Sequence, residues 1–339
     1  MNTYTEVSID NYDRVVYCEN DKVGLKAFIA VHSTKLGPAL GGCRLWNYKT
    51  RNDALTDVLR LSKGMTYKNA LADLKLGGGK SVIWGNSKSP RLLRAMGEFV
   101  EYIGGDYIIA EDVGVNSSDV KIIRKKTKHT VNPNIGDPGP TTAAGVFIGI
   151  RAAYKFKYGV DSLNDVGVAV LGVGSVGMAL TKMLIDDGAR VTVADINEES
   201  LMKAADLGAW PSPQQFLHTL EAFPVFSPCA LGGILNDEVI SNMNSTIVAG
   251  AANNQLLEER HGQALMDAGI LYAPDFVINS GGVIMVSSGT KNGFSLKVSK
   301  KKVNNISDTL IRIFERSEKL KKPTNVIANE MAEEILGII

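Results

Sequence analysis

Apolar and polar positions divide the chain into short runs of strand length and segments of helical periodicity. Residues 53–65 carry apolar side chains at the spacing of one helix face, and Ser89-Pro90 begins a second helix that continues towards Ile103. Apolar runs lie between and around these helices. The strands predicted in this part are residues 15–17, 27–31, 81–84 and 107–110.

A second series of strands and helices follows residues 132–140, a segment rich in proline, glycine and asparagine that predicts a linker or hinge. Small residues at 141–154 then predict a closely packed helix, and polar-faced helices are expected at 303–320 and 323–336. The strands predicted between them are residues 168–171, 191–194, 246–249 and 270–272.

This alternation of strands and helices favours an α/β protein whose parallel sheet is covered by helices on both faces. A length of 339 residues fits two domains. We expect the first domain at residues 1–135 and a Rossmann-type, doubly wound domain at residues 136–320. The C-terminal helix, at residues 321–339, is expected to pack back on the first domain.

The composition is that of a soluble globular protein, with 45% hydrophobic and 22% charged residues. A formal net charge of +1 gives no general attraction for nucleic acid or membranes, and roughly 18 consecutive apolar residues, the length of a membrane span, occur nowhere. Three widely spaced cysteines fit neither a disulfide framework nor a zinc site, and the N-terminus lacks the apolar core of a signal peptide. We therefore expect a cytoplasmic protein that acts on small molecules and binds no metal.

A glycine motif, G-V-G-S-V-G at residues 172–177, follows a predicted strand and opens a predicted helix. The first glycine allows a tight turn, the second a close approach of backbone to a pyrophosphate, and the third close packing of helix on strand. Asp195 ends the next strand, where a carboxylate accepts ribose hydroxyls and repels a 2′-phosphate, so we expect NAD rather than NADP. A glycine-rich turn without a ligand is the alternative. The cofactor-binding residues expected from this motif are Gly172, Gly174, Ser175, Val176, Gly177 and Asp195.

Asn253 and Asn279 stand at what the pattern predicts to be strand ends, where open α/β sheets bind ligands. Their amides could contact the nicotinamide, its ribose or the substrate. Capping or turn formation is the alternative interpretation of both residues.

Two lysines and an acidic turn are the strongest candidates for chemistry. Lys68 lies in K-G-M-T-Y-K, Lys80 follows the glycine run 77–79, and Asp112 lies in A-E-D-V-G after a predicted strand. Two partly desolvated ammonium groups lower each other's pKa, and a glycine run is expected where backbone passes close to a ligand. One cation can hold a substrate carboxylate, the second can polarise a carbonyl, and the protein carboxylate can shuttle a proton. Those are the tasks needed to interconvert a 2-oxo acid and an amino acid. A cap for a helix at 117–125 is the alternative for the acidic turn.

Blocks of sequence spread over the chain occur in an order that is typical of one enzyme family. They include L-G-P-A-L-G-G-C-R (36–44), R-L-S-K-G-M-T-Y-K (60–68), A-E-D-V-G (110–114) and A-P-D-F-V-I-N-S-G-G-V (273–283). In these blocks the chain resembles the amino acid dehydrogenases of the Glu/Leu/Phe/Val family, most closely the leucine dehydrogenases, with phenylalanine dehydrogenase-like features. The resemblance implies a substrate-binding and oligomerisation domain, an NAD-binding domain, and a cleft between them that closes to exclude water. It also implies a homo-oligomer of at least two subunits.

The resemblance gives each candidate residue a role in the reversible oxidative deamination of an L-amino acid. It implies that Lys68 binds the substrate α-carboxylate, that Lys80 activates the water that adds to C2, and that Asp112 exchanges a proton with the substrate nitrogen. Thr142 falls where the family contacts the nicotinamide carboxamide, and Asn253 where it has an asparagine near the substrate and the nicotinamide ribose.

Substrate preference follows from the pocket positions that the resemblance implies. Glutamate enzymes of the family place a lysine where this chain has Leu40, and an unpaired buried carboxylate is costly, so the substrate side chain should be apolar. Leucine, valine or isoleucine is the first expectation, and phenylalanine or tryptophan is the alternative, because G-G-C-R and G-G-G-K resemble phenylalanine enzymes. A non-catalytic NAD-binding sensor is a third hypothesis. The expected substrate-binding residues are Leu40, Gly41, Met65, Lys68, Ala110, Asn253, Val283 and Val286.

Overall fold

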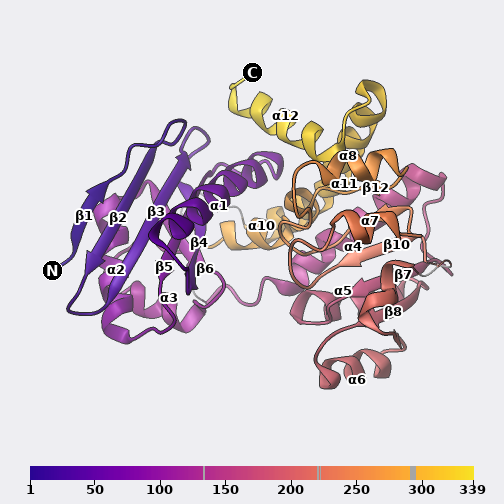
Figure 1. Ribbon diagram of the computed structural model, residues 1–339, viewed down its shortest axis with the longest axis horizontal. Helices are drawn as coiled ribbons and strands as arrows, with labels where there is room; N and C mark the ends of the chain where they lie inside the picture. The colour runs from indigo at the N-terminus through magenta and orange to yellow at the C-terminus, as the bar shows by residue number, and fades with distance from the viewer. Residues whose placement is uncertain (133, 220, 222, 291–294) are drawn as a thin grey trace. The chain divides into compact units, whose positions relative to one another are not determined.

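The computed structural model describes residues 1–132, 134–219, 221, 223–290 and 295–339. Contacts divide the chain into two compact units (Figure 1). The division after Gly136 falls inside the expected linker, of which Pro133 lies outside the described residues. Residues 321–339 were expected to pack on the first domain, but only 335–338 of them belong to the first unit, and 321–334 belong to the second. The first unit holds Met1–Gly136, Val286–Leu296 and Ile335–Ile338, and the second holds Asp137–Met285, Lys297–Glu334 and Ile339.

A mixed six-stranded sheet forms the centre of the first unit, with the strand order β1-β2-β3-β5-β4-β6. The pairs from β1 through β3 to β5 are antiparallel, whereas β5, β4 and β6 run parallel to one another. The strands are β1 (Thr3–Glu6), β2 (Arg14–Asn20), β3 (Leu25–Ser33), β4 (Ala39–Trp46), β5 (Gly77–Trp84) and β6 (Tyr107–Glu111).

The helices of the first unit begin where the sequence supplies a capping side chain. Thr50, Ser89 and Asn116 each accept a hydrogen bond from a backbone N–H of the first turn that follows them. A cap of this kind contributes about 1 kcal/mol to stability. Because Asn116 caps the third helix, the acidic turn before it is not required for that purpose. The helices are α1 (Arg51–Leu71), α2 (Pro90–Ile103) and α3 (Ser117–Ile123).

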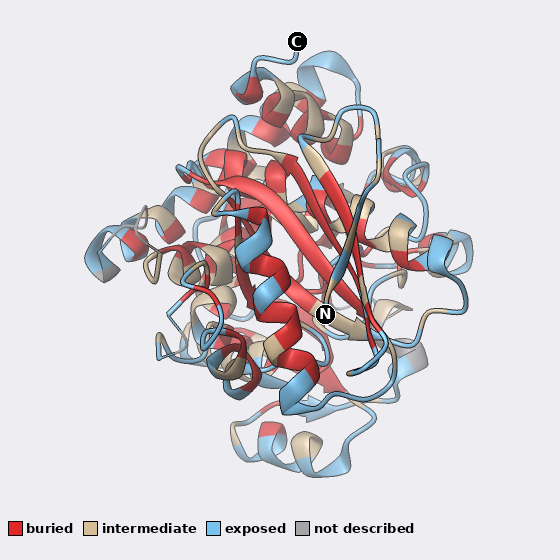
Figure 2. Cartoon of the chain, turned by 90° about the vertical axis from the view of Figure 1, so that its left-hand side faces the viewer, coloured by how far each residue is buried: buried red, intermediate tan, exposed pale blue. Residues whose placement is uncertain are grey.

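The two faces of this sheet bury different side chains. Cys43 and Ile109 belong to a core that also contains residues of α2 and α3, whereas Val82 packs with Ala54 and Val58 of α1. Side chains alternate along a strand, so the even-numbered positions of β4, β5 and β6 face α1. Figure 2 shows the central strands of this sheet as buried along most of their length.

A parallel six-stranded sheet forms the centre of the second unit, with the strand order β12-β11-β10-β7-β8-β9. Chain order therefore reverses between β7 and β10, which is the switch point of a doubly wound fold. The strands are β7 (Gly167–Leu171), β8 (Arg190–Ala194), β9 (Trp210–Pro211), β10 (Val225–Pro228), β11 (Ile247–Val248) and β12 (Leu271–Tyr272).

Helices α4 and α5 precede and follow β7, and the remaining helices connect or follow the later strands. Within the described ranges, no helix combines the length and the apolar content that a membrane span requires. The helices are α4 (Gly139–Tyr158), α5 (Ser175–Asp186), α6 (Glu198–Asp206), the 3-10 helix η1 (Gln214–Thr219), α7 (Asp237–Ser241), α8 (His261–Asp267), α9 (Asp275–Ile278), α10 (Gly281–Ser287), α11 (Leu296–Leu320) and α12 (Thr324–Leu336).

The predicted α/β fold class is confirmed, and each predicted strand occurs in the structure. The pattern missed four strands: β1 and β9 at the sheet edges, and β4 and β10, each of which lies between two neighbouring strands. Gly41 and Gly42 lie within β4, and Pro228 ends β10. Glycine and proline weaken the local preference for a strand, and here pairing on both sides overrides it.

Candidate active site

Lys80 and Asp112 form an ion pair in the first unit, with 2.9 Å between Lys80 Nζ and Asp112 Oδ2. Lys80 lies in the middle of β5, and Asp112 follows the last residue of β6. Their side chains are 8% and 22% exposed, so the lysine is almost withdrawn from water while its partner keeps limited access. A charge pair in such a setting interacts more strongly than one on the surface.

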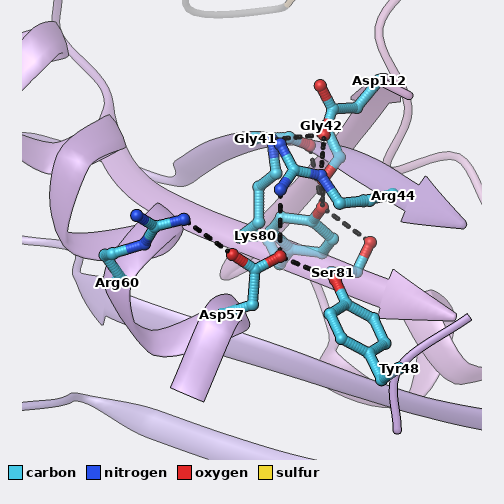
Figure 3. A network of polar contacts seen from close by, with 10 residues as sticks. Gly41, Gly42, Arg44, Tyr48, Asp57, Arg60, Lys80, Ser81 and Asp112 are labelled. Carbon is cyan, nitrogen blue, oxygen red and sulfur yellow. Dashed lines mark hydrogen bonds and ion pairs between the residues drawn. The ribbon is translucent and has the colours of Figure 1, made fainter. Parts of the chain in front are cut away.

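Arg44, on β4, is a second cation on the same carboxylate (Figure 3). Its Nε lies 3.2 Å from Asp112 Oδ2, the oxygen that Lys80 also contacts. Burial opposes the ionisation of Asp112, but the charges of Lys80 and Arg44 outweigh it, and the pKa of Asp112 is lowered. The carboxylate is therefore held in its charged form, as a proton acceptor requires.

The far end of Arg44 binds a second carboxylate. Arg44 Nη1 lies 2.9 Å from Asp57 Oδ2 on α1, and the Tyr48 hydroxyl donates to the same oxygen at 2.6 Å. Arg60 Nη2 lies 3.1 Å from the other oxygen, Asp57 Oδ1. Figure 3 shows this series of alternating charges from Arg60 to Lys80. The sequence interpretation did not single out Arg44, Asp57 or Tyr48.

Two glycines of β4 let this strand approach its neighbours closely. A Cβ at Gly41 would lie 1.7 Å from Gly79 O, and a Cβ at Gly42 would lie 2.5 Å from Glu111 O. The Tyr107 hydroxyl, buried between the strands, donates to Gly41 O at 2.8 Å. The close approach of β4 and β6 is what places Asp112 within reach of Arg44.

The glycine run 77–79 is explained by contacts within the protein, which corrects the expectation of a close ligand. A Cβ at Gly78 would lie 2.0 Å from Thr66 N on α1, and a Cβ at Gly77 would lie 2.0 Å from Ser33 O. At Gly79 the nearest atom is Tyr107 Cδ2, at 2.7 Å. Gly78 therefore allows α1 to lie directly on β5, whereas Gly77 and Gly79 make room for Ser33 and for the Tyr107 ring.

This packing brings α1, with its candidate substrate residues, beside the strand that carries Lys80. Lys68 lies in the last turn of α1, and Met65 lies about one turn before it. On the sheet, Leu40 is 1% exposed and pairs with Gly78, while Ala110 is 7% exposed and pairs with Gly42. Val283 and Val286 both lie on α10, but Val286 belongs to the first unit and Val283 to the second.

The glycine motif of the second unit forms the turn between β7 and α5. Gly172 has a φ of +97°, and a Cβ there would lie 2.8 Å from Ala230, which follows β10. A Cβ at Gly177 would lie 1.9 Å from Gly172 O, whereas a Cβ at Gly174 would meet nothing within 4 Å. Gly174 is the N-cap of α5 and supplies no side-chain cap to the helix. The turn therefore presents uncapped N–H groups beside open space at the switch point, an arrangement that fits a pyrophosphate.

Asp195 and Asp137 are the carboxylates that meet this turn. Asp195 Oδ2 accepts the Val173 N–H at 2.7 Å, so the carboxylate at the end of β8 orients the glycine turn itself. Asp137 Oδ2 accepts the Ser175 hydroxyl at 2.9 Å, so the Ser175 side chain is already engaged. Val176 occupies the turn of α5 between Ser175 and Gly177. The sequence interpretation did not identify Asp137, because it lies in the linker and far from the motif in sequence.

The structure brings Asn253 and Asn279 together, with 2.8 Å between Asn279 Nδ2 and Asn253 Oδ1. Asn279 ends the short helix α9 and not a strand, which corrects that expectation. Among the described residues, the buried Asn279 Oδ1 has no hydrogen-bond partner, so it remains able to accept one from a ligand. The Thr142 hydroxyl donates to Pro138 O at 3.0 Å in the first turn of α4. Across the described part of the chain, no group of three or more potential metal-ligating side chains occurs.

Two family models match most of the chain. The model described as Glu/Leu/Phe/Val dehydrogenase, dimerisation domain, matches residues 13–129. The model described as Glutamate/Leucine/Phenylalanine/Valine dehydrogenase matches residues 197–332.

Individual relatives are similar over almost their full lengths. A leucine dehydrogenase from Thermoactinomyces intermedius is 45% identical over 96% of this chain and 90% of the relative. A phenylalanine dehydrogenase from Caldalkalibacillus thermarum is 42% identical over 99% of this chain and 94% of the relative. Among solved structures, the L-tryptophan dehydrogenase from Nostoc punctiforme is 40% identical, covers 96% of both chains and superposes with a TM-score of 0.85.

Proposed function

The chain belongs to the Glu/Leu/Phe/Val dehydrogenase family and is an amino acid dehydrogenase, and on this premise we propose that it catalyses the NAD-dependent, reversible oxidative deamination of an apolar L-amino acid. The L-amino acid, NAD⁺ and water give the 2-oxo acid, ammonium, NADH and a proton. The single observation that carries this proposal is the 2.9 Å contact between Lys80 and Asp112 on a largely buried sheet face.

The residues of the first unit divide the work of this reaction. Lys80 activates the water that adds to C2 of the substrate, and Asp112 takes a proton from the substrate nitrogen and later returns one. Lys68, partly buried near the end of α1, holds the α-carboxylate of the substrate. Fixed charges in a site of limited water access stabilise developing charge without reorganising, which is the main advantage of such an arrangement.

A nicotinamide dinucleotide fits the second unit. When it is bound, its nicotinamide accepts the hydride from C2 of the substrate. The uncapped start of α5 and the open space at Gly174 support a pyrophosphate at this turn. NAD is the specific cofactor that we propose, because the Asp195 carboxylate would repel the 2′-phosphate of NADP. Asn253, Asn279 and Thr142 are the proposed contacts of the nicotinamide end.

Leucine, valine and isoleucine are the substrates that we propose first. Leu40 and Ala110 are buried apolar side chains at the proposed pocket, and neither can pair with an acidic substrate side chain. The leucine dehydrogenase relative supports this assignment. An aromatic substrate is the second candidate, because the phenylalanine and tryptophan dehydrogenase relatives are nearly as similar.

A panel of 2-oxo acids with ammonium and NADH tests the proposal. We expect the consumption of NADH to be fastest with 4-methyl-2-oxopentanoate or its branched relatives. Faster turnover of phenylpyruvate or indolepyruvate would replace the aliphatic assignment by the aromatic one. Binding of NADH without turnover of any panel member would favour a non-catalytic sensor.

We further propose a homo-oligomer of at least two subunits, because a dimerisation domain of the family matches residues 13–129. A cytoplasmic location is part of the same proposal, because the substrates and the cofactor are cytoplasmic metabolites. The measurement that decides the assembly is the mass of the purified protein in solution.

A further inference from the structure

Arg44 joins the acid–base candidate to a carboxylate on a different element. Its Nε contacts Asp112 Oδ2 at 3.2 Å, and its Nη1 contacts Asp57 Oδ2 at 2.9 Å. The Arg44 side chain is 20% exposed, so both contacts are made at limited access to water. A guanidinium is planar and rigid, so two simultaneous contacts fix its orientation, which a single flexible ammonium cannot do.

The far end of this bridge is itself held in place. The Tyr48 hydroxyl donates to Asp57 Oδ2, and Arg60 contacts Asp57 Oδ1. Burial opposes the ionisation of Asp57, but the Tyr48 hydrogen bond and the Arg44 and Arg60 charges outweigh it and lower the pKa of Asp57. Arg44 therefore binds a second, firmly charged carboxylate on α1, and β4, α1 and the end of β6 are connected through it.

Lys80 and Arg44 share one oxygen of Asp112 but differ in what else they must do. In the proposed reaction Lys80 turns to the attacking water, whereas Arg44 remains anchored to Asp57. Both cations contact the same oxygen, Asp112 Oδ2, at 2.9 Å from Lys80 Nζ and 3.2 Å from Arg44 Nε. A half-buried carboxylate that lost its only cation would tend to take up a proton.

We propose that Arg44 is the positioning residue of the site: it holds Oδ2 of Asp112 when Lys80 turns to the substrate, so that the carboxylate stays charged and fixed in place to exchange a proton with the substrate nitrogen. This inference rests on the proposed function. Arg44 acts through Asp112 and is not itself assigned a contact with the substrate.

The sign of the expected pH effect follows from the groups around Asp112. The titratable groups that interact electrostatically with it are Lys80 on β5, Arg44 and Cys43 on β4, Tyr48 after β4, and Tyr107 on β6. Only Lys80 and Arg44 among these are cations. Removing the Arg44 charge therefore raises the pKa of Asp112, and the acid limb of the deamination profile, which requires the unprotonated carboxylate, moves to higher pH.

The test compares Arg44→Gln, Arg44→Lys and Arg60→Gln with the wild type in pH profiles of deamination. For Arg44→Gln we expect the acid limb of the kcat/KM profile to shift to higher pH by about one unit. We also expect kcat to fall about 10- to 100-fold, with a smaller change in KM. Arg44→Lys restores the charge, so its acid limb should stay near that of the wild type. Arg60→Gln is the matched control, because Arg60 contacts the outer oxygen of Asp57 and its side chain is 60% exposed.

Thermal unfolding and NADH binding establish that each variant is folded. An unchanged acid limb in Arg44→Gln, or an equal shift in Arg60→Gln, would overturn the positioning role. If Arg44→Gln does not fold, the kcat of Arg44→Lys decides. An ammonium cannot hold both carboxylates in the fixed geometry of a guanidinium, so a wild-type kcat in Arg44→Lys would overturn the role.

A second readout separates this inference from the proposed function. In protein labelled with ¹³C at aspartate carboxyls, the Asp112 resonance is identified by its disappearance in Asp112→Asn, and its titration is followed without substrate. A higher pKa of Asp112 in Arg44→Gln supports the bridge even if the wild type turns over no amino acid, an outcome that would defeat the proposed function alone. An unchanged titration would overturn the bridge whatever the activity.

Discussion

Asp112 carries the charge on which the candidate site depends, and its surroundings show how single residues set a chemical state. Burial alone would favour the neutral acid, but Lys80 and Arg44 lower the pKa of the carboxyl. The folded protein therefore keeps Asp112 ionised to lower pH than an unfolded chain does. The stability from this group is present above the unfolded pKa and is lost as the pH falls through the folded one.

Asp195 is the residue whose substitution tests cofactor choice. In Asp195→Asn the carboxylate charge is lost, so we expect the preference for NAD over NADP, as a ratio of kcat/KM values, to fall about 10-fold or more. The amide retains an oxygen for the Val173 N–H, which Asp195 Oδ2 accepts at 2.7 Å, so the glycine turn keeps its support. Steady-state kinetics with both cofactors measure the ratio.

Asp186→Asn is the control for this substitution, because Asp186 is an exposed carboxylate at the end of α5 that pairs with Lys182. Its ratio should equal that of the wild type. An unchanged preference in Asp195→Asn would contradict the ribose assignment.

Elements fit together in the first unit because glycines remove side chains where helix and strand touch. Thr66 of α1 lies so close to Gly78 of β5 that no Cβ has room between them. The same contact sets how far α1, with Lys68 and Asp57, lies from the strand that carries Lys80. Packing of this element pair therefore also determines the geometry of the candidate site.

Gly78→Ala is the prediction that belongs to this scale. The new Cβ would lie 2.0 Å from Thr66 N, so helix and strand must separate, and we expect the free energy of unfolding to fall by about 3 kcal/mol. Urea unfolding at a fixed protein concentration measures the change.

Gly64→Ala provides the matched control on α1, since a Cβ at this exposed glycine meets nothing within 4 Å. In a helix interior, alanine stabilises relative to glycine by about 0.5–1 kcal/mol, so this variant should be at least as stable as the wild type. Equal stability of Gly78→Ala and the wild type would show that the sheet adapts without strain.

Across the whole molecule, the candidate catalytic residues and the candidate cofactor-binding turn lie in different units. Lys80 and Asp112 belong to the first unit, whereas the glycine turn and Asp195 belong to the second. The expectation of a cleft that closes between the two domains stays a prediction. The candidate catalytic residues lie within one unit and the candidate cofactor-binding residues within the other. Catalysis and cofactor binding can therefore be separated by substitution.

Lys80→Ala tests that separation. We expect kcat to fall about 10³-fold or more, because the group that activates water is removed, while the dissociation constant for NADH stays unchanged. Assays of turnover measure kcat, and fluorescence titration with NADH measures the dissociation constant. Lys75→Ala, an exposed lysine before the same strand, should alter neither. Loss of NADH affinity in Lys80→Ala would mean that Lys80 belongs to the cofactor site.

The sequence by itself determined the fold class, the position of most elements and the residues of the two motifs. Hydrophobic periodicity and caps such as Ser89-Pro90 are local properties, and strands and helices follow from them. The glycine motif between β7 and α5 likewise depends on residues that are adjacent in the chain. The pairing of Lys80 with Asp112 could be hypothesised because both residue types were required by one reaction.

Only the tertiary structure decided which side chains meet across elements. Strand β4 was not predicted, because its glycines have a weak local preference for a strand and its pairing partners are distant in sequence. The contacts of Arg44 with Asp57 and Asp112, and of Asp137 with Ser175, join segments that no local pattern relates. The physical reason is that such contacts depend on sheet order and on close packing, and both are properties of the folded chain as a whole.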